Sequence, residues 1–257
     1  MSAKPLSRIG DLSPLKKESA DKVKAAATEA PVSIPEARAT PAPGEHPGVE
    51  RWPVKTGTDA DVAKVGQNTV KGEALGQGIV ETTVEEMLTF KRAADMPAVT
   101  KAFTKNSFYQ DRRAAPTETT IWRLTALITG VKLEQDGDYH LVLQGQNAKT
   151  TMIGEIPNPD PAYVGNAAWL AEIKTAREAM DKFLGAPLTA KDFAPEDMGP
   201  PTEERPSGKE KDESSFMTPV GKTAIITGVG FFDSSHGQTG VAPTAIELHP
   251  IFSLVFE

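Results

Sequence analysis

The sequence predicts a mainly β protein with one or two helices: a five-stranded OB-like barrel in the order β-β-β-α-β-β, behind a long disordered or extended N-terminal tail. Three observations lead to this fold class. Runs of β-branched and apolar residues begin near residue 116, one amphipathic helix interrupts them, and the first 50 residues are rich in proline and alanine. The 257 residues are enough for one large domain or two small ones.

The composition of residues 1–50 predicts a disordered or extended tail. The stretch "PVSIPEARATPAPGEHPG" at 31–48 is interrupted by prolines, each of which removes a backbone donor and restricts the residue before it. Few large apolar residues are present, so burial cannot offset the entropy of ordering this segment. A second polar, proline-rich stretch at 187–215 predicts an exposed insertion in the barrel.

Residues 51–115 predict an ordered loop and a short helix that pack on the core. The segment "ERWPVKTGTDADV" at 50–62 has the character of a loop anchored by Trp52. Further along, Thr82 or Thr83 precedes a glutamate by three positions, which is the spacing of a capping box. Apolar residues follow at helical spacing, so a helix of two or three turns is expected to begin there.

Residues 116–257 supply the barrel. The first strand falls in "TTIWRLTALITGVKLEQ" at 119–135, which is too long for one flat strand and predicts a bent strand shared by two faces of a barrel. The "DGD" at 136–138 predicts a hairpin. The second and third strands fall in "YHLVLQG" at 139–145 and "TTMIGEIP" at 150–157.

A helix and two strands complete the order. Asn166 and Gly185 are suitable caps for a helix whose apolar residues recur at i, i+3 and i+4 between them. The last strands fall in "KTAIITGVGFFD" at 222–233 and "AIELHPIFSLVFE" at 245–257. Pro250 predicts a strand edge or a bulge, because proline has no backbone N–H to donate.

Polar residues of these strands predict a binding site. Side chains alternate along a strand, so the apolar residues belong inside the barrel and the ionisable residues between them lie on its outer face. The loop 234–243 is glycine-rich and longer than a hairpin needs, which is typical of loops that bind. The candidate site residues are His140, Glu155, Asp233, His236, Glu247 and His249.

These residue types allow two interpretations. Histidines and carboxylates can bind a divalent metal such as zinc or manganese, or act as general acid and base. Alternatively, exposed Glu and His side chains are solvated, or pair across strands for a few tenths of a kcal/mol. The sequence therefore predicts no cofactor, with a divalent metal ion as the alternative.

Three functions follow, in order of preference. The first is a non-enzymatic binding or structural module that presents the barrel face and the 234–243 loop to a protein or polymer partner in an assembly. The alternative is a metal-dependent hydrolase of the phosphodiesterase or nuclease kind that uses the His/Glu cluster. Single-stranded nucleic-acid binding ranks last, because aromatic residues make up 6% of the chain and Arg112, Arg113 and Arg123 form the one small basic cluster near the barrel.

Charge and composition exclude other classes. The formal net charge of −7 gives the whole chain no attraction to nucleic acid or an anionic membrane. The absence of cysteine excludes disulfides, thiolate nucleophiles and cysteine-ligated zinc. No export signal is seen and no apolar run approaches the ~20 residues of a membrane span, so a soluble, cytoplasmic protein is expected.

Four blocks of the chain match a known pattern in order: "ERWPVKTGTDADV", "ETTIWRLTALITGVKLEQDGDYHLVL", "TMIGEIPNP" and "ITGVGFFDSSHGQTGVAPTAIELHP". Together they resemble a bacterial protein family of unassigned function whose members end in a "GVGFFD…HGQTGVAP…IELHP" block. The resemblance covers most of 50–257 outside 187–215, and it implies that the OB-like core is a shared unit. It implies no activity, and because many relatives are exported it does not fix the compartment. Thr244 stands where the family pattern has asparagine, a difference that affects loop geometry only.

Overall fold

The structure is a computed structural model. It describes residues 50–67, 69–70, 73–74, 78–104, 106–134, 137–147, 149–160, 164, 167–189, 217–235 and 237–257. The predicted tail up to residue 49, nearly all of the insertion predicted at 187–215, Asn166 and His236 lie outside these residues.

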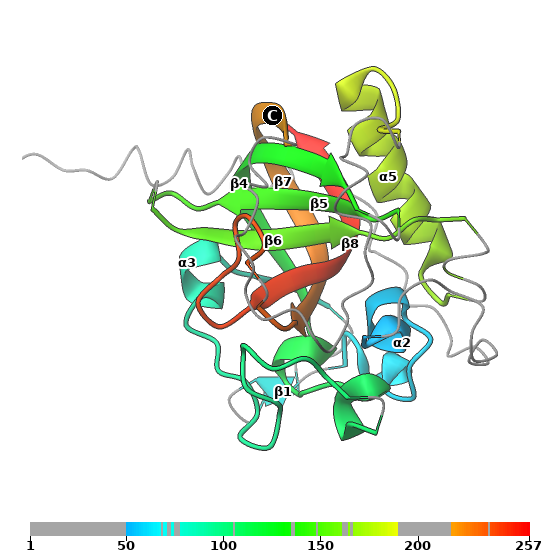
Figure 1. The fold of residues 1–257 in the computed structure, drawn as a ribbon, viewed down its shortest axis with the longest axis vertical. Helices are drawn as coiled ribbons and strands as arrows, with labels where there is room; N and C mark the ends of the chain where they lie inside the picture. The colour runs from blue at the N-terminus through cyan, green and yellow to red at the C-terminus, as the bar shows by residue number, and fades with distance from the viewer. Residues whose placement is uncertain are drawn as a thin grey trace, which may run out of the picture. The chain divides into compact units, whose positions relative to one another are not determined.

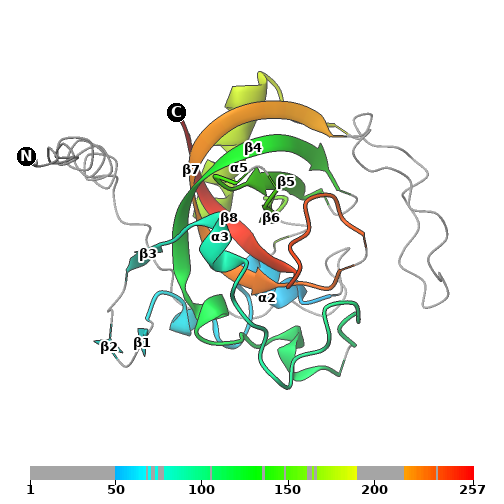
Figure 2. The same cartoon turned by 90° about the vertical axis from the view of Figure 1, so that its left-hand side faces the viewer.

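The core is a six-stranded mixed sheet in the order β3-β4-β5-β6-β8-β7 (Figure 1). The strands are β3 (Ile79–Glu81), β4 (Ile121–Leu133), β5 (Tyr139–Gln144), β6 (Thr151–Ile156), β7 (Thr218–Phe232) and β8 (Ile246–Phe256). Because β4 also pairs with β7, the five strands β4, β5, β6, β8 and β7 form a closed circuit of hydrogen-bonded neighbours, and the sheet curls round on itself (Figure 2). The prediction of a mainly β protein is confirmed.

The prediction of five strands is wrong by one in this sheet. β3 pairs in parallel with the start of β4, from Ile79 opposite Ile121 to Glu81 opposite Arg123. β5 reaches β4 only from Leu127 onward, so the earlier part of that edge is open to another strand. A strand of three residues is too short to show an alternating pattern, which is why the sequence did not reveal it. A separate pair, β1 (Thr69–Val70) and β2 (Glu73–Ala74), lies in the same stretch of chain.

The long strands bend where the sequence places glycine or proline. The pairing of β4 shifts register between Ile128 and Gly130, and the pairing of β7 with β8 shifts on both sides of Gly228. A Cβ atom on Gly228 would lie 2.8 Å from the carbonyl oxygen of Pro250, so only glycine allows this close approach. The bent first strand and the bulge near Pro250 are therefore confirmed.

Helix α5 (Leu170–Leu184) packs against β8 through Ile173, Ala176 and Met180. It ends at Gly185, which has φ 82° in the left-handed region, as the sequence predicts. Its N-cap residue is Trp169, whose side chain makes no capping hydrogen bond. In the part of the chain that the structure describes, no helix is both long enough and apolar enough to cross a membrane.

The segment predicted as a loop around Trp52 contains a short helix instead. Helix α2 (Trp52–Thr56) has proline in its first turn and ends at Gly57, whose φ is 75°. Proline near a helix start and glycine just after its end are ordinary boundary signals, so the sequence did contain the information for this helix. Trp52 is buried, as expected of an anchor.

Helix α3 (Val84–Met87) begins with the predicted capping box but is shorter than the predicted two or three turns. The Thr83 hydroxyl accepts from the Glu86 N–H at 3.1 Å, and the Glu86 carboxylate accepts from the Thr83 N–H at 3.2 Å. After Met87 the Thr89 N–H donates to the Glu86 carbonyl and the Phe90 N–H to the Met87 carbonyl, both at 3.0 Å, so tighter turns replace the α-helix after four residues.

We expect Thr83→Ala to lower the free energy of unfolding by about 1 kcal/mol, because it removes the side-chain oxygen that caps α3. Thr83→Ser keeps that oxygen and should retain most of the stability. Urea denaturation of both variants measures the difference. Equal losses in the two variants would show that the hydroxyl is not what stabilises this turn.

Candidate functional site

Four of the candidate residues share one face of the sheet. His140 on β5 lies directly opposite Glu155 on β6. Ile153, two positions before Glu155, pairs with Glu247 on β8, and His249 follows two positions later. Residues two apart on a strand point to the same side, so the four side chains converge where β5, β6 and β8 are neighbours.

The solvent exposure expected for these residues is wrong. Each of His140, Glu155, Glu247 and His249 exposes at most 5% of its surface. They do lie on the face opposite Tyr139, Leu141 and Leu143 of β5, but that face is covered. The predicted alternation along the strands is right. The prediction was wrong because another segment of the chain covers this face of the sheet.

The cover is formed by residues 233–235 and 237–245 between β7 and β8, which lie against β5 and β6 in both views (Figures 1 and 2). The Thr239 carbonyl oxygen lies 2.9 Å from His140 Nε2. At Gly240 an added Cβ would lie 2.8 Å from the Val142 side chain, so the backbone lies tightly against β5. The inner side of the predicted binding loop is therefore packed on the site residues.

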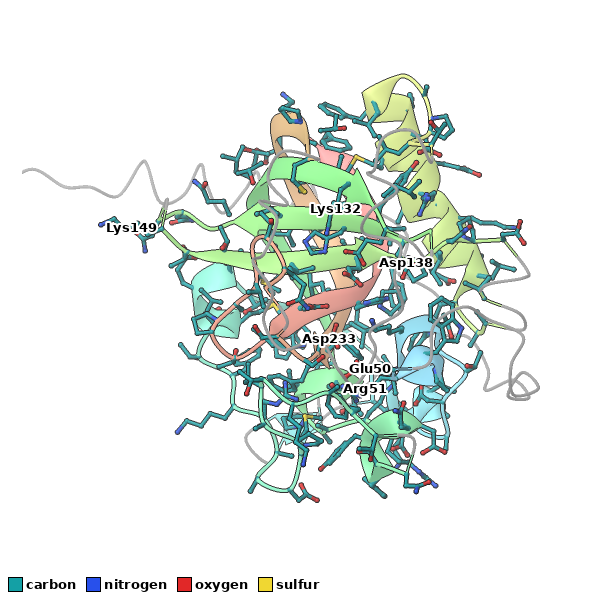
Figure 3. All side chains as sticks on the ribbon, viewed as in Figure 1. Glu50, Arg51, Lys132, Asp138, Lys149 and Asp233 are labelled. Carbon is teal, nitrogen blue, oxygen red and sulfur yellow. The ribbon has the colours of Figure 1, made fainter. Side chains whose placement is uncertain are left out.

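Asp233 makes its contacts outside this cluster. Asp233 follows β7, and its Oδ2 lies 3.6 Å from Lys55 Nζ while its Oδ1 accepts from the Ser234 N–H at 2.8 Å. Figure 3 shows it lower in the view than Asp138 and closer to Arg51. His236 lies outside the described residues.

Two carboxylates that sequence reasoning missed complete the cluster. Glu134 follows β4 and Asp138 precedes β5, and the Glu134 N–H donates to the Asp138 carbonyl oxygen at 2.8 Å across the hairpin. Asp138 is two positions before His140, so the same alternation already places it on the His140 side. Glu134 is the residue opposite Asp138 in the predicted hairpin, so the register of that hairpin would have added Glu134 to the candidate residues.

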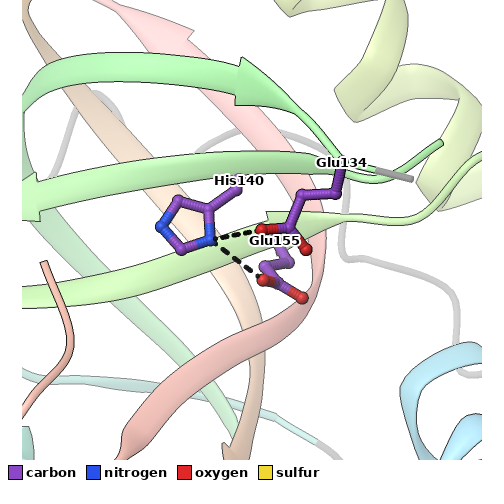
Figure 4. Close-up of side chains that lie close together, drawn as sticks. All are labelled: Glu134, His140 and Glu155. Carbon is purple, nitrogen blue, oxygen red and sulfur yellow. Dashed lines mark hydrogen bonds and ion pairs between the residues drawn. The ribbon is translucent and has the colours of Figure 1, made fainter. Parts of the chain in front are cut away.

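The first group of side chains is Glu134, His140 and Glu155 (Figure 4). His140 Nδ1 lies 3.2 Å from Oε1 of Glu134 and 3.2 Å from Oε1 of Glu155. Burial alone lowers the pKa of His140, but the two carboxylates outweigh burial and raise that pKa to about 10. The second ring nitrogen faces the Thr239 carbonyl, which fixes the ring so that Nδ1 points at both carboxylates.

The second group is Asp138, Glu155 and His249. His249 Nδ1 lies 2.7 Å from Glu155 Oε2, and its Nε2 lies 3.6 Å from Asp138 Oδ2. Burial is the largest influence on the His249 imidazole and lowers its pKa. Glu155 belongs to both groups, with a different oxygen toward each histidine.

Glu247 lies next to His249 of the second group. Its Oε2 is 4.0 Å from His249 Nδ1, and neither carboxyl oxygen has a hydrogen-bond partner in the described part of the chain. Burial raises the pKa of this carboxyl well above the usual range, and the charges of Glu155 and Asp233 raise it further. Burying a carboxyl without a donor is costly, so this group is not explained by hydrogen bonding within the described part of the chain.

Both groups contain the kinds of donor atom that hold a metal ion. In each group the potential ligand atoms lie within 4.8 Å of one another. Ligands bound about 2.0–2.1 Å from a tetrahedral zinc ion lie about 3.4 Å from one another. The distances of 3.2 Å from His140 Nδ1 to Glu134 and to Glu155, and of 3.6 Å from His249 Nε2 to Asp138, are close to this spacing. Nitrogen and carboxylate oxygen donors without thiolate are the set that zinc and manganese accept.

Comparison with known proteins supplies no relative to set beside this geometry: no family model, no curated protein and no solved structure matches the chain.

Proposed function

We propose that this protein is a divalent-metal-binding module built on an OB-like barrel. The OB-like interpretation is supported by the closed circuit β4-β5-β6-β8-β7 and by the position of α5 in the chain between β6 and β7. The metal is held by side chains of β5, β6 and β8 together with the hairpin residues Glu134 and Asp138.

The orientation of His140 carries this proposal. A metal-binding histidine almost always donates its second ring N–H to a carboxylate or a carbonyl, which fixes the ring and its tautomer. The Thr239 carbonyl is placed for that role, 2.9 Å from Nε2, and leaves Nδ1 facing Glu134 and Glu155. Glu247, buried without a donor, supports the same conclusion because a cation nearby would supply the missing opposite charge.

We expect full-length protein purified without a histidine tag or chelator to contain zinc or manganese. Chelation should lower the Tm and added metal should restore it, because a ligand that binds only the folded state stabilises it by about 2.7 kcal/mol at 100 times its Kd. Elemental analysis and thermal denaturation measure the two effects. Glu81→Gln, on an exposed carboxylate that pairs with Arg123, is the matched control and should respond like the wild type. Protein without metal, and without a Tm response to it, would contradict the proposal.

Metal-dependent hydrolysis is a second candidate function. Glu134 keeps 27% of its side-chain surface exposed, so the first group reaches solvent at this residue while the second is enclosed. A metal ion with three protein ligands and an open position is the usual form of a catalytic site. Hydrolysis of a generic phosphodiester that depends on added metal and is lost in Glu134→Gln would support it.

Partner binding, expected first from the sequence, stays a prediction. The outer side of the 234–243 loop offers it some support, since Gly237 and Pro243 are exposed. Nucleic-acid binding gains none from the basic cluster. Arg113 pairs with buried Asp59 at 2.7 Å, and Arg112 lies 3.3 Å from Asp61, so these guanidinium groups are already engaged by carboxylates.

A further inference from the structure

We infer that the centre holds two metal ions side by side, with Glu155 as the carboxylate that bridges them. The inference rests on the proposed function and specifies its stoichiometry. It follows from the positions of the two oxygen atoms of one side chain.

Glu155 lies between the two histidines. Its Oε1 is 3.2 Å from His140 Nδ1, and its Oε2 is 2.7 Å from His249 Nδ1. The two groups of potential ligands share this residue and no other. A carboxylate that offers one oxygen to each of two ligand sets is arranged to bridge, and paired ions in proteins lie about 3.5–4 Å apart.

The sheet explains why Glu155 has this central position. β6 lies between β5 and β8, so a side chain of β6 has a neighbour on either side. His140 is its direct partner on β5. His249 comes from β8, beyond the residues that pair with Ile153 and Gly154.

The surrounding charges suit two dications. Besides the shared Glu155, each group contains one carboxylate and one imidazole. These are Glu134 and His140 in the first group, and Asp138 and His249 in the second. Glu247 adds a fourth carboxyl beside His249. When all four are ionised, these carboxylates carry the formal charge of two divalent ions, and Lys132 Nζ, 3.2 Å from Glu134 Oε1, adds one positive charge beside the first group.

Two features separate this centre from an ordinary buried ion-pair network. Both oxygens of Glu247 are buried without a hydrogen bond in the described part of the chain, and so is His249 Nε2, whose nearest carboxylate oxygen is Asp138 Oδ2 at 3.6 Å. A network that had evolved only to satisfy its own polar groups would not leave these atoms unbonded. Glu247 Oε2 lies 4.0 Å from His249 Nδ1, beside the group that would hold the second ion.

The test measures metal stoichiometry and spin coupling on the full-length chain. Metal-free protein is titrated with Mn²⁺ and followed by calorimetry and electron paramagnetic resonance. We expect two ions per chain and the spectrum of a coupled Mn²⁺ pair. His140→Ala and His249→Ala should each bind a single ion and give an uncoupled spectrum, while Glu81→Gln should behave as wild type.

The outcomes are distinct. One ion per wild-type chain would overturn the paired centre and leave the proposed metal binding standing, whereas no ion would overturn both. Two ions with an uncoupled spectrum would overturn the bridging role of Glu155. The wild-type spectrum decides between these results even if a histidine variant fails to fold.

Discussion

Replacing Glu118 by glutamine will lower the free energy of unfolding by about 3–5 kcal/mol, because it leaves the guanidinium of Arg51 buried without its counter-charge. Arg51 and Glu118 are both fully buried. Arg51 Nη1 and Nη2 donate to the two oxygens of Glu118 at 2.6 and 2.8 Å, a bidentate pair. The same carboxylate accepts the N–H groups of Ala114 and Phe232, so glutamine would also place an amide donor against backbone donors.

The pair joins the chain before the sheet to the end of β7. Arg51 Nη1 also donates to the carbonyl of Phe232 at 2.7 Å, and Nε donates to the carbonyl of Tyr109 at 2.9 Å. The aromatic rings of Phe103 and Phe231 lie 4.9 and 4.6 Å from the guanidinium carbon. Loss of the counter-charge will therefore loosen the packing of the segment around Tyr109 on the sheet.

Urea denaturation measures this loss. Lys64→Gln is the control, because Lys64 is 67% exposed and its ion pair with Asp61 at 2.7 Å is expected to contribute at most about 1 kcal/mol. The double variant Arg51→Met/Glu118→Met should be more stable than either single variant, since it leaves no uncompensated charge. A loss in Glu118→Gln no larger than that in Lys64→Gln would contradict the argument.

The parts of the fold that follow from local pattern were predictable. Alternation along β5, β6 and β8 placed His140, Glu155 and His249 on one face, because the strand period depends on the backbone alone. The bend at Gly130 and the bulge near Pro250 also follow from single residues whose backbone properties are fixed.

The burial of the site could not be predicted in the same way. It depends on the contact between Thr239 and His140, which are 99 positions apart. The glycine-rich composition of the connecting loop shows that it can turn, and says nothing of the surface on which it folds. The pair of Arg51 and Glu118, 67 positions apart, escaped the sequence for the same reason.

Replacing Glu247 by methionine will raise the stability of the metal-free protein by about 1–3 kcal/mol, which is the cost of burying a polar group without a hydrogen bond. Methionine fills a similar volume and needs no donor. The same variant should bind metal about 10- to 100-fold more weakly, as expected when a group close to the ligands is lost. Stability and metal affinity should thus change in opposite directions.

Leu248→Met is the matched control for Glu247→Met. Leu248 is the next residue of β8, fully buried on the opposite face, so its replacement tests methionine in the strand without touching the carboxyl. It should cost less than about 1.5 kcal/mol and leave metal affinity unchanged. Denaturation of metal-free protein and calorimetric titration with zinc give both quantities. If Glu247→Met destabilises the metal-free fold, the carboxyl serves that fold directly. A stabilised variant that has lost affinity shows instead that the chain keeps a costly buried acid because the acid is needed when a cation is bound.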